Sequence, residues 1–119
     1  MKKYNLILSG LLIILVSSCV QKSYKQTVVF MLDVKGVKNI KSVGIRGENQ
    51  PLNWNSDFAM TLDKDSIYTA TISGETGYLF SEFKFTINND FELKEKPNRR
   101  VYFNKDGRTI YKATFNKIK

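Results

Sequence analysis

Short stretches of apolar, β-branched and aromatic residues recur from residue 27 almost to the end of the chain, and polar turn residues separate them. This composition is typical of β-strands. Hairpin turns are expected at Asn89-Asp90 and Asp106-Gly107. No segment after residue 26 has a helical period, so the pattern predicts an all-β fold, an antiparallel sandwich or barrel of about seven strands. The expected strands cover residues 27–34, 42–46, 58–62, 67–73, 79–87, 100–103 and 109–115.

Alternation within three of these strands predicts which side chains face the core. Polar Lys84 and Thr86 alternate with aromatic and aliphatic neighbours, which is typical of a strand with one face in water. The side chains expected to point inward are Tyr68, Ala70 and Ile72, then Phe83, Phe85 and Ile87, and finally Val101 and Phe103.

The first nineteen residues have the pattern of an export signal. Lys2 and Lys3 precede an apolar run over residues 6–16, which is shorter than the roughly 18 residues needed to span a bilayer. The run ends in Val16-Ser17-Ser18-Cys19, which resembles the bacterial lipobox. The resemblance implies a lipidated Cys19 at the mature N-terminus; the alternative is an ordinary secretory signal with an incidental cysteine. We therefore expect a signal peptide (1–19), a tether (20–26) and one domain (27–119).

The residue types present argue against most catalytic chemistry. The chain has no histidine, and Cys19 is its only cysteine, so we expect no disulfide, zinc knuckle or cysteine nucleophile. Asp63 and Asp65 suit a turn. Glu92 and Glu95 could act together only across a cleft that a domain of this size hardly offers. We expect no catalytic residues, no metal site and no cofactor.

The chain is basic, with a formal net charge of +8. Without Lys2 and Lys3, seventeen basic and eleven acidic residues remain, a net charge of +6. The lysines are scattered rather than gathered in a stripe, so we expect no nucleic-acid partner. Positive charge of this kind favours association with anionic lipid or polysaccharide.

The order of several motifs between residues 27 and 115 resembles the starch-binding domain of carbohydrate-binding module family 20, and more loosely its glycogen-binding relatives. The resemblance implies an immunoglobulin-like antiparallel β-sandwich of about seven strands that binds α-glucan on a shallow surface. The matching stretches are Val28-Val29-Phe30, Pro51-Leu52-Asn53-Trp54, the strand 67–72, Ser81-Glu82-Phe83-Lys84-Phe85 and Pro97-Asn98-Arg99.

The resemblance also implies a sugar site. Trp54, the only tryptophan, together with Lys84 and Asn98, stands where the family has its tryptophan, lysine and asparagine. Leu93 replaces the family's second tryptophan, and Phe91 could substitute only if its loop were repositioned. Losing one indole is expected to cost about 1 to 3 kcal/mol of binding free energy. The family's second site has no aromatic counterparts here.

Each of these residues also has a structural interpretation. Trp54 could anchor its loop in the core, Lys84 could be a solvated strand residue, and Asn98 could stabilise its own turn. Arg99 and Arg100 are expected to pair at the surface with Glu92 or Glu95, contributing at most about 1 kcal/mol.

Together these features predict a non-catalytic, lipid-anchored α-glucan-binding protein of the bacterial envelope. Its expected partners are starch or a related polysaccharide, the membrane through Cys19, and envelope proteins of glycan utilisation. Val20-Gln21 lacks the aspartate associated with inner-membrane retention, which favours the outer membrane. The alternative is a structural or protein-interaction lipoprotein whose sandwich has lost its sugar site.

Overall fold

The computed structural model describes residues 22–118, so the expected signal peptide and Cys19 lie outside the described residues. The described residues form no helix, and hence none of the length and apolarity that a membrane span requires. They form the strands β1 (Tyr24–Asp33), β2 (Val43–Gly47), β3 (Phe58–Ala59), β4 (Thr61–Lys64), β5 (Ile67–Thr76), β6 (Phe80–Ile87), β7 (Asp90–Phe91), β8 (Arg99–Tyr102) and β9 (Arg108–Thr114).

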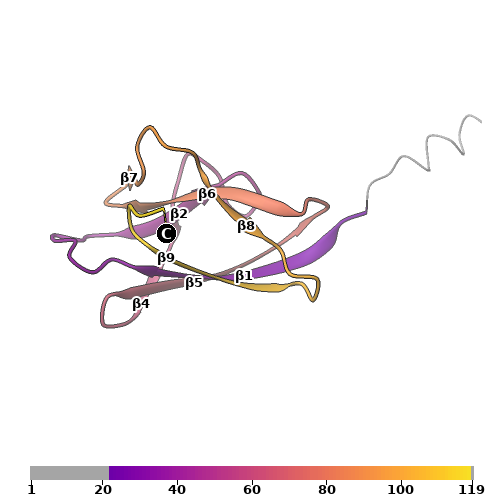
Figure 1. Cartoon of the computed structure of the whole chain (residues 1–119), viewed down its shortest axis with the longest axis horizontal. Helices are drawn as coiled ribbons and strands as arrows, with labels where there is room; N and C mark the ends of the chain where they lie inside the picture. The colour runs from indigo at the N-terminus through magenta and orange to yellow at the C-terminus, as the bar shows by residue number, and fades with distance from the viewer. Residues whose placement is uncertain (1–21, 119) are drawn as a thin grey trace, which may run out of the picture.

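The strands make two sheets that pack face to face as a sandwich (Figure 1). The first sheet has the order β4-β5-β1-β9. In the second, β3 and β2 lie on one side of β6, and β7 and β8 share its other edge. The all-β sandwich predicted from the sequence is confirmed. The structure differs from the predicted antiparallel sandwich of about seven strands in two ways: the described residues form nine strands, and β1 pairs with β9 in parallel.

One expected strand, 58–62, belongs to both sheets. β3 pairs with β2 in the second sheet, whereas β4 pairs with β5 in the first. Met60, between them, is buried, and its N–H donates to the carbonyl of Val43 at 2.9 Å. The chain therefore changes sheets at Met60, which a continuous strand pattern does not predict.

Other strand boundaries and both expected hairpin turns also differ from the expectation. β1 begins at Tyr24, so the last three residues of the expected tether are strand. The hairpin turn before β7 is Asn88-Asn89, one residue early, and both residues have positive φ (53° and 67°), as a type I′ turn requires. Asp106-Gly107 is not in a hairpin, because β8 and β9 lie in different sheets.

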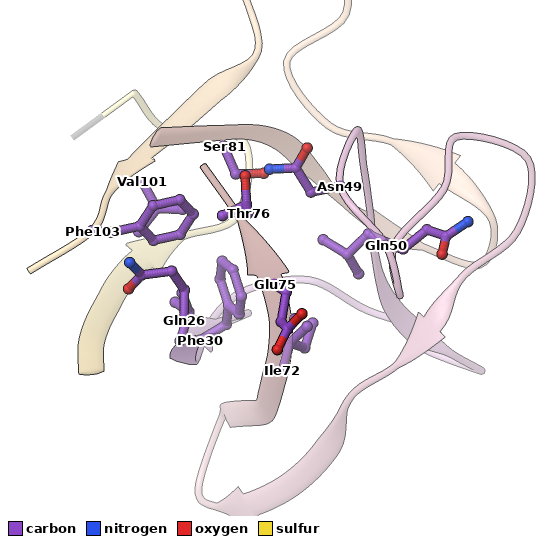
Figure 2. Close-up of a pocket in the computed structure, with 13 residues that line it drawn as sticks. Gln26, Phe30, Asn49, Gln50, Ile72, Glu75, Thr76, Ser81, Val101 and Phe103 are labelled. Atoms are coloured by element: carbon purple, nitrogen blue, oxygen red, sulfur yellow. The ribbon is translucent and has the colours of Figure 1, made fainter. Parts of the chain in front are cut away.

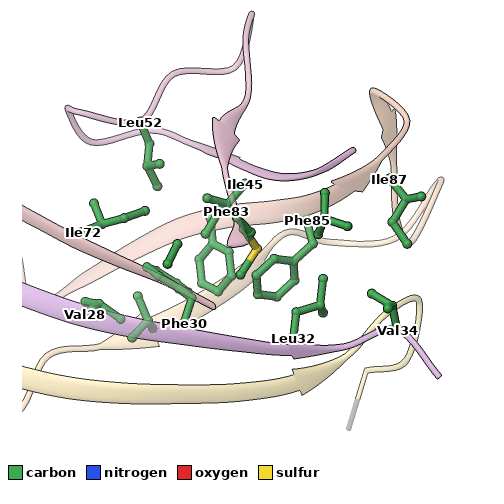
Figure 3. Packing of buried hydrophobic residues seen from close by; sticks show 14 residues of the cluster. Val28, Phe30, Leu32, Val34, Ile45, Leu52, Ile72, Phe83, Phe85 and Ile87 are labelled. Carbon is green, nitrogen blue, oxygen red and sulfur yellow. The ribbon is translucent and has the colours of Figure 1, made fainter. Parts of the chain in front are cut away.

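The core lies between the sheets, where aliphatic side chains surround the rings of Phe30, Phe83 and Phe85 (Figure 3). Phe30 of β1 meets Phe83 of β6 edge to face, with ring centroids 4.9 Å apart. The predicted inward faces are confirmed: Ala70, Ile72, Phe83, Phe85, Ile87 and Val101 are buried, and Tyr68 and Phe103 pack against them. Because alternate residues point to opposite faces, Glu82, Lys84 and Thr86 of β6 lie on the outer side of the second sheet, whereas Ser81 is buried on the inner side.

Candidate functional site

The outer side of the second sheet brings together three of the four residues predicted to bind sugar, namely Trp54, Lys84 and Asn98. Lys84 of β6 lies directly opposite Arg46 of β2, and Phe91 of β7 lies opposite Thr86 of β6. Loops place the remaining side chains beside these strands. We call this surface the candidate face, and it comprises Arg46, Trp54, Glu82, Lys84, Phe91 and Asn98.

Two aromatic rings adjoin on the candidate face. The rings of Trp54 and Phe91 have centroids 6.3 Å apart and planes inclined by 50°, and both side chains are partly exposed. The loop that carries Trp54 is shaped by Asn53, whose side-chain oxygen accepts hydrogen bonds from the backbone N–H groups of Asn55 and Ser56, both at 2.9 Å. Trp54 is therefore neither a core residue nor a free-standing ring.

Arg46 and Asp57 fasten this loop to the sheet. Arg46 Nε donates to Asp57 Oδ1 at 2.7 Å, and the Thr86 hydroxyl donates to the same oxygen at 2.8 Å. The Arg46 guanidinium also lies over the Phe91 ring, 5.1 Å from its centroid, and contacts the carbonyl of Trp54 at 3.4 Å. One cation thus links the Phe91 ring to the backbone of the loop that carries Trp54.

Lys84 is partly engaged by the loop that follows β7. Its ammonium donates to the carbonyls of Leu93 and Lys96, both at 3.0 Å. An ammonium has three N–H donors, so one is left for a ligand. The Leu93 side chain is only 5% exposed, and its backbone has a positive φ of 50°. Leu93 therefore contributes a carbonyl to the lysine and no side chain to the candidate face.

Asn98 is held beside Glu82 of β6. Its amide donates to Glu82 Oε1 at 3.2 Å, and Arg100 Nε donates to Glu82 Oε2 at 2.8 Å. These hydrogen bonds, that of Asn98 first, lower the pKa of Glu82 below its ordinary value of 4.5. Because the folded-state pKa is lowered, the interaction is complete above pH 4.5 and is lost as the pH falls through the lowered value.

For Arg99 the expected partner is confirmed, but the expected position at the surface is wrong. For Arg100 the expected partner is wrong. Arg100 pairs with Glu82, not with Glu92 or Glu95. Arg99 does pair with Glu92, but the pair is buried, with exposed fractions of 6% and 1%. Its two contacts are 2.6 and 2.8 Å long. Burial alone would lower the pKa of Arg99, but the hydrogen bonds and charge interactions with Glu92 and Tyr111 together outweigh it and raise the pKa. Glu92 is thus unavailable as a partner of Glu95.

A small cavity opens between the sheets near the start of β1 (Figure 2). Its volume is about 40 Å³, far below the roughly 300 Å³ of ordinary small-molecule sites. Gln26 Oε1 and Asn49 Nδ2 are buried there without a hydrogen-bond partner among the described residues. A sugar ring does not fit this cavity. No cluster of three metal-ligating side chains occurs within residues 22–118.

Arg46 and Glu82 of the candidate face were not predicted as site residues, and neither was Asp57 beside it. The ring that adjoins Trp54 is Phe91, whereas Leu93 is buried. Arg46 contacts the Phe91 ring and, with Asp57, holds the loop of Trp54. The position of Phe91 could have been predicted from the turn at Asn88-Asn89. A two-residue turn there pairs Phe91 with Thr86, which places the Phe91 ring on the outer side of the second sheet. Nothing in the local sequence of Arg46 or Asp57 indicates their contact.

No protein-family model matches the chain, and no curated protein is significantly similar to it. A functional proposal therefore depends on the residues of the candidate face and on the motif order in the sequence.

Proposed function

We propose that the chain is a non-catalytic α-glucan-binding module of the starch-binding type, carried by a lipid-anchored protein of the bacterial envelope. The observation that supports this most is the pairing of Trp54 with Phe91 beside Lys84. A sugar ring has apolar C–H faces and a polar rim of hydroxyl groups. A ligand site for it therefore needs aromatic planes with hydrogen-bonding groups next to them.

The candidate face meets both needs. The two rings supply rigid contact area at low entropic cost. The remaining donor of Lys84 and the exposed amide of Asn98 are suited to hydroxyl groups. The planes of the two rings are inclined by 50°, so the rings form an open wedge rather than a flat platform. A curved glucan chain fits such a wedge better than a flat chain does.

Binding of the chain to amylose, glycogen and maltoheptaose tests the proposal. Affinity electrophoresis and calorimetry of residues 20–119 should show retention. Trp54→Ala and Phe91→Ala should each weaken binding about tenfold or more, as expected for central aromatic contacts. Tyr24→Ala, which removes an exposed ring from the other sheet, is the matched control and should bind like wild type.

Two results would count against the proposal. Absence of retention of the wild-type chain at millimolar ligand would refute glucan binding. Unchanged binding by both Trp54→Ala and Phe91→Ala, with thermal unfolding unchanged, would leave the function but remove this site.

The lipid anchor is a separate part of the proposal. We propose that Cys19 is acylated and that Val20-Gln21 directs the protein to the outer membrane, because no aspartate follows the cysteine. Mass spectrometry of the protein purified from membranes should find the acyl chains on Cys19. Cys19→Ala should release the protein from the membrane fraction or leave its signal uncleaved.

One observation favours the alternative function, a protein-interaction lipoprotein without a sugar site. Two of the three donors of Lys84 are already engaged by the carbonyls of Leu93 and Lys96. A lysine that mainly closes a loop has little left for a ligand. The binding measurements above decide between the two functions.

A further inference from the structure

We infer that the end of the sandwich at which β1 begins rests on a phospholipid surface. We call this end the anchor-end surface; it comprises Tyr24, Lys25, Tyr78, Leu79 and Lys105. The inference depends on the lipid anchor proposed above, but it does not depend on glucan binding.

Three segments distant in sequence meet at this end (Figure 1). They are the start of β1, the β5–β6 connection at residues 77–79 and the β8–β9 connection at residues 103–107. Tyr24 pairs with Thr76 at the end of β5. The Phe103 N–H donates to the carbonyl of Leu79 at 3.0 Å. The Thr27 N–H likewise donates to the carbonyl of Gly107 at 2.8 Å, so the segments form one continuous surface.

This surface exposes large apolar side chains. Leu79 is 80% exposed, Tyr78 66% and Tyr24 61%. Leu79 is the most exposed large apolar residue of residues 22–118. A tyrosine has an apolar ring and a polar tip, and such residues gather at membrane–water interfaces. A leucine at the tip of a connection adds a group that can enter the acyl boundary.

The charges around these side chains fit the same partner. The basic residues at this end are Lys22, Lys25, Lys105 and Arg108, and the acidic ones are Glu48, Glu75 and Asp106. The carboxylate of Asp106 also accepts a hydrogen bond from the Arg108 backbone N–H at 3.0 Å. The excess of one positive charge attracts the phosphate groups of phospholipids.

The position of the proposed anchor selects lipid over other occupants. Tyr24 is five positions after Cys19, and a fully extended chain over five positions spans at most about 18 Å. An acylated Cys19 therefore keeps the anchor-end surface close to the bilayer. Thr86, level with the Trp54–Phe91 pair, is six residues along β6 from Phe80, or roughly 20 Å. The Trp54–Phe91 pair consequently lies away from the membrane, whereas Glu82 is only two residues along β6 from Phe80.

Site-specific labels on the mature, acylated chain test the inference. Leu79→Cys and Leu62→Cys are each labelled with an environment-sensitive fluorophore, and the protein is reconstituted in vesicles of phosphatidylethanolamine and phosphatidylglycerol. Leu62 is the matched control, because it is also an exposed leucine (52%). It lies across β5 from Leu32, which is eight residues along β1 from Tyr24, or roughly 27 Å.

A nitroxide on the lipid headgroup should quench the label at position 79 and leave the label at position 62 bright. Aqueous iodide should give the opposite order. Equal iodide quenching of both labels on acylated protein would overturn the inference and leave the anchor intact. The label at position 79 could instead be protected from iodide to a degree that rises with protein concentration, without being quenched by the nitroxide. That result would overturn the inference and indicate contact with a second copy of the chain. Absence of acyl chains on Cys19 would remove the anchor and this inference together, whereas glucan binding is measured independently.

Discussion

At the scale of single residues, the buried pair of Glu92 and Arg99 organises the loop behind the candidate face. Glu92 accepts hydrogen bonds from the backbone N–H groups of Phe85 and Asn116, and Arg99 donates to the carbonyls of Thr114 and Lys117. A buried ion pair is stable only when its remaining donors and acceptors are also satisfied. Here they are satisfied by the backbone, which ties β6, the loop and the C-terminal residues together.

Glu92→Gln should therefore destabilise the fold by about 3 to 5 kcal/mol, because it leaves the Arg99 cation buried without its counter-charge. Urea unfolding measures the change. Glu82→Gln makes the same substitution in the more exposed pair with Arg100 and should leave the unfolding midpoint nearly unchanged. Equal midpoints for the two variants would contradict the structural role given to Glu92.

At the scale of secondary-structure elements, β2 positions the loop that carries Trp54 and Asp57, because Gly44 of β2 has no side chain. Gly44 on the outer side of β2 lies under Asp57, and a Cβ there would come 2.5 Å from Asp57 Cγ. Asp57 in turn binds Arg46 and Thr86. The close contact between Asp57 and β2 therefore requires glycine at position 44.

Gly44→Ala should push Asp57 off its partners, cost about 1 to 3 kcal/mol of stability and weaken glucan binding. The coupling to Asp57 can be measured directly with a double-mutant cycle. If the effect acts through Asp57, then Asp57→Ala and Gly44→Ala together should cost clearly less than the sum of the two single changes. Additive costs would show that the methyl group acts elsewhere.

At the scale of the whole molecule, β6 connects the core with two surfaces, the candidate face and the anchor-end surface. Its inner side chains form the core, its outer side chains belong to the candidate face, and its first residue borders the anchor-end surface. Since the strand is eight residues long, the anchor and the aromatic pair lie toward its opposite ends. An anchored module of this shape presents its binding face to the surroundings.

Trp54 reports on this arrangement, because it is the only tryptophan. Acrylamide should quench its fluorescence equally in residues 20–119 free in solution and in the acylated protein on vesicles. Maltoheptaose should reduce quenching in both forms. Protection of Trp54 by vesicles without sugar would place the candidate face against the membrane and contradict the proposed orientation.

Much of the fold was predictable because its signals are local. The alternation in β5 and β6 identified their buried sides, since side chains of a strand alternate with a period of two whatever the strand pairs with. The same locality explains a failure. The stretch 58–62 reads as one strand, and only pairing with β2 and β5 divides it at Met60.

Local sequence patterns were enough to predict the all-β class and the inward residues of the central strands, and the order of motifs pointed to Trp54, Lys84 and Asn98. Three features became known only from the three-dimensional structure: the ring of Phe91 adjoins Trp54, Leu93 is buried, and β9 runs parallel to β1. The physical reason is sequence separation. Trp54 and Phe91 are 37 residues apart, and their contact depends on the pairing of β2, β6 and β7, which no local pattern encodes.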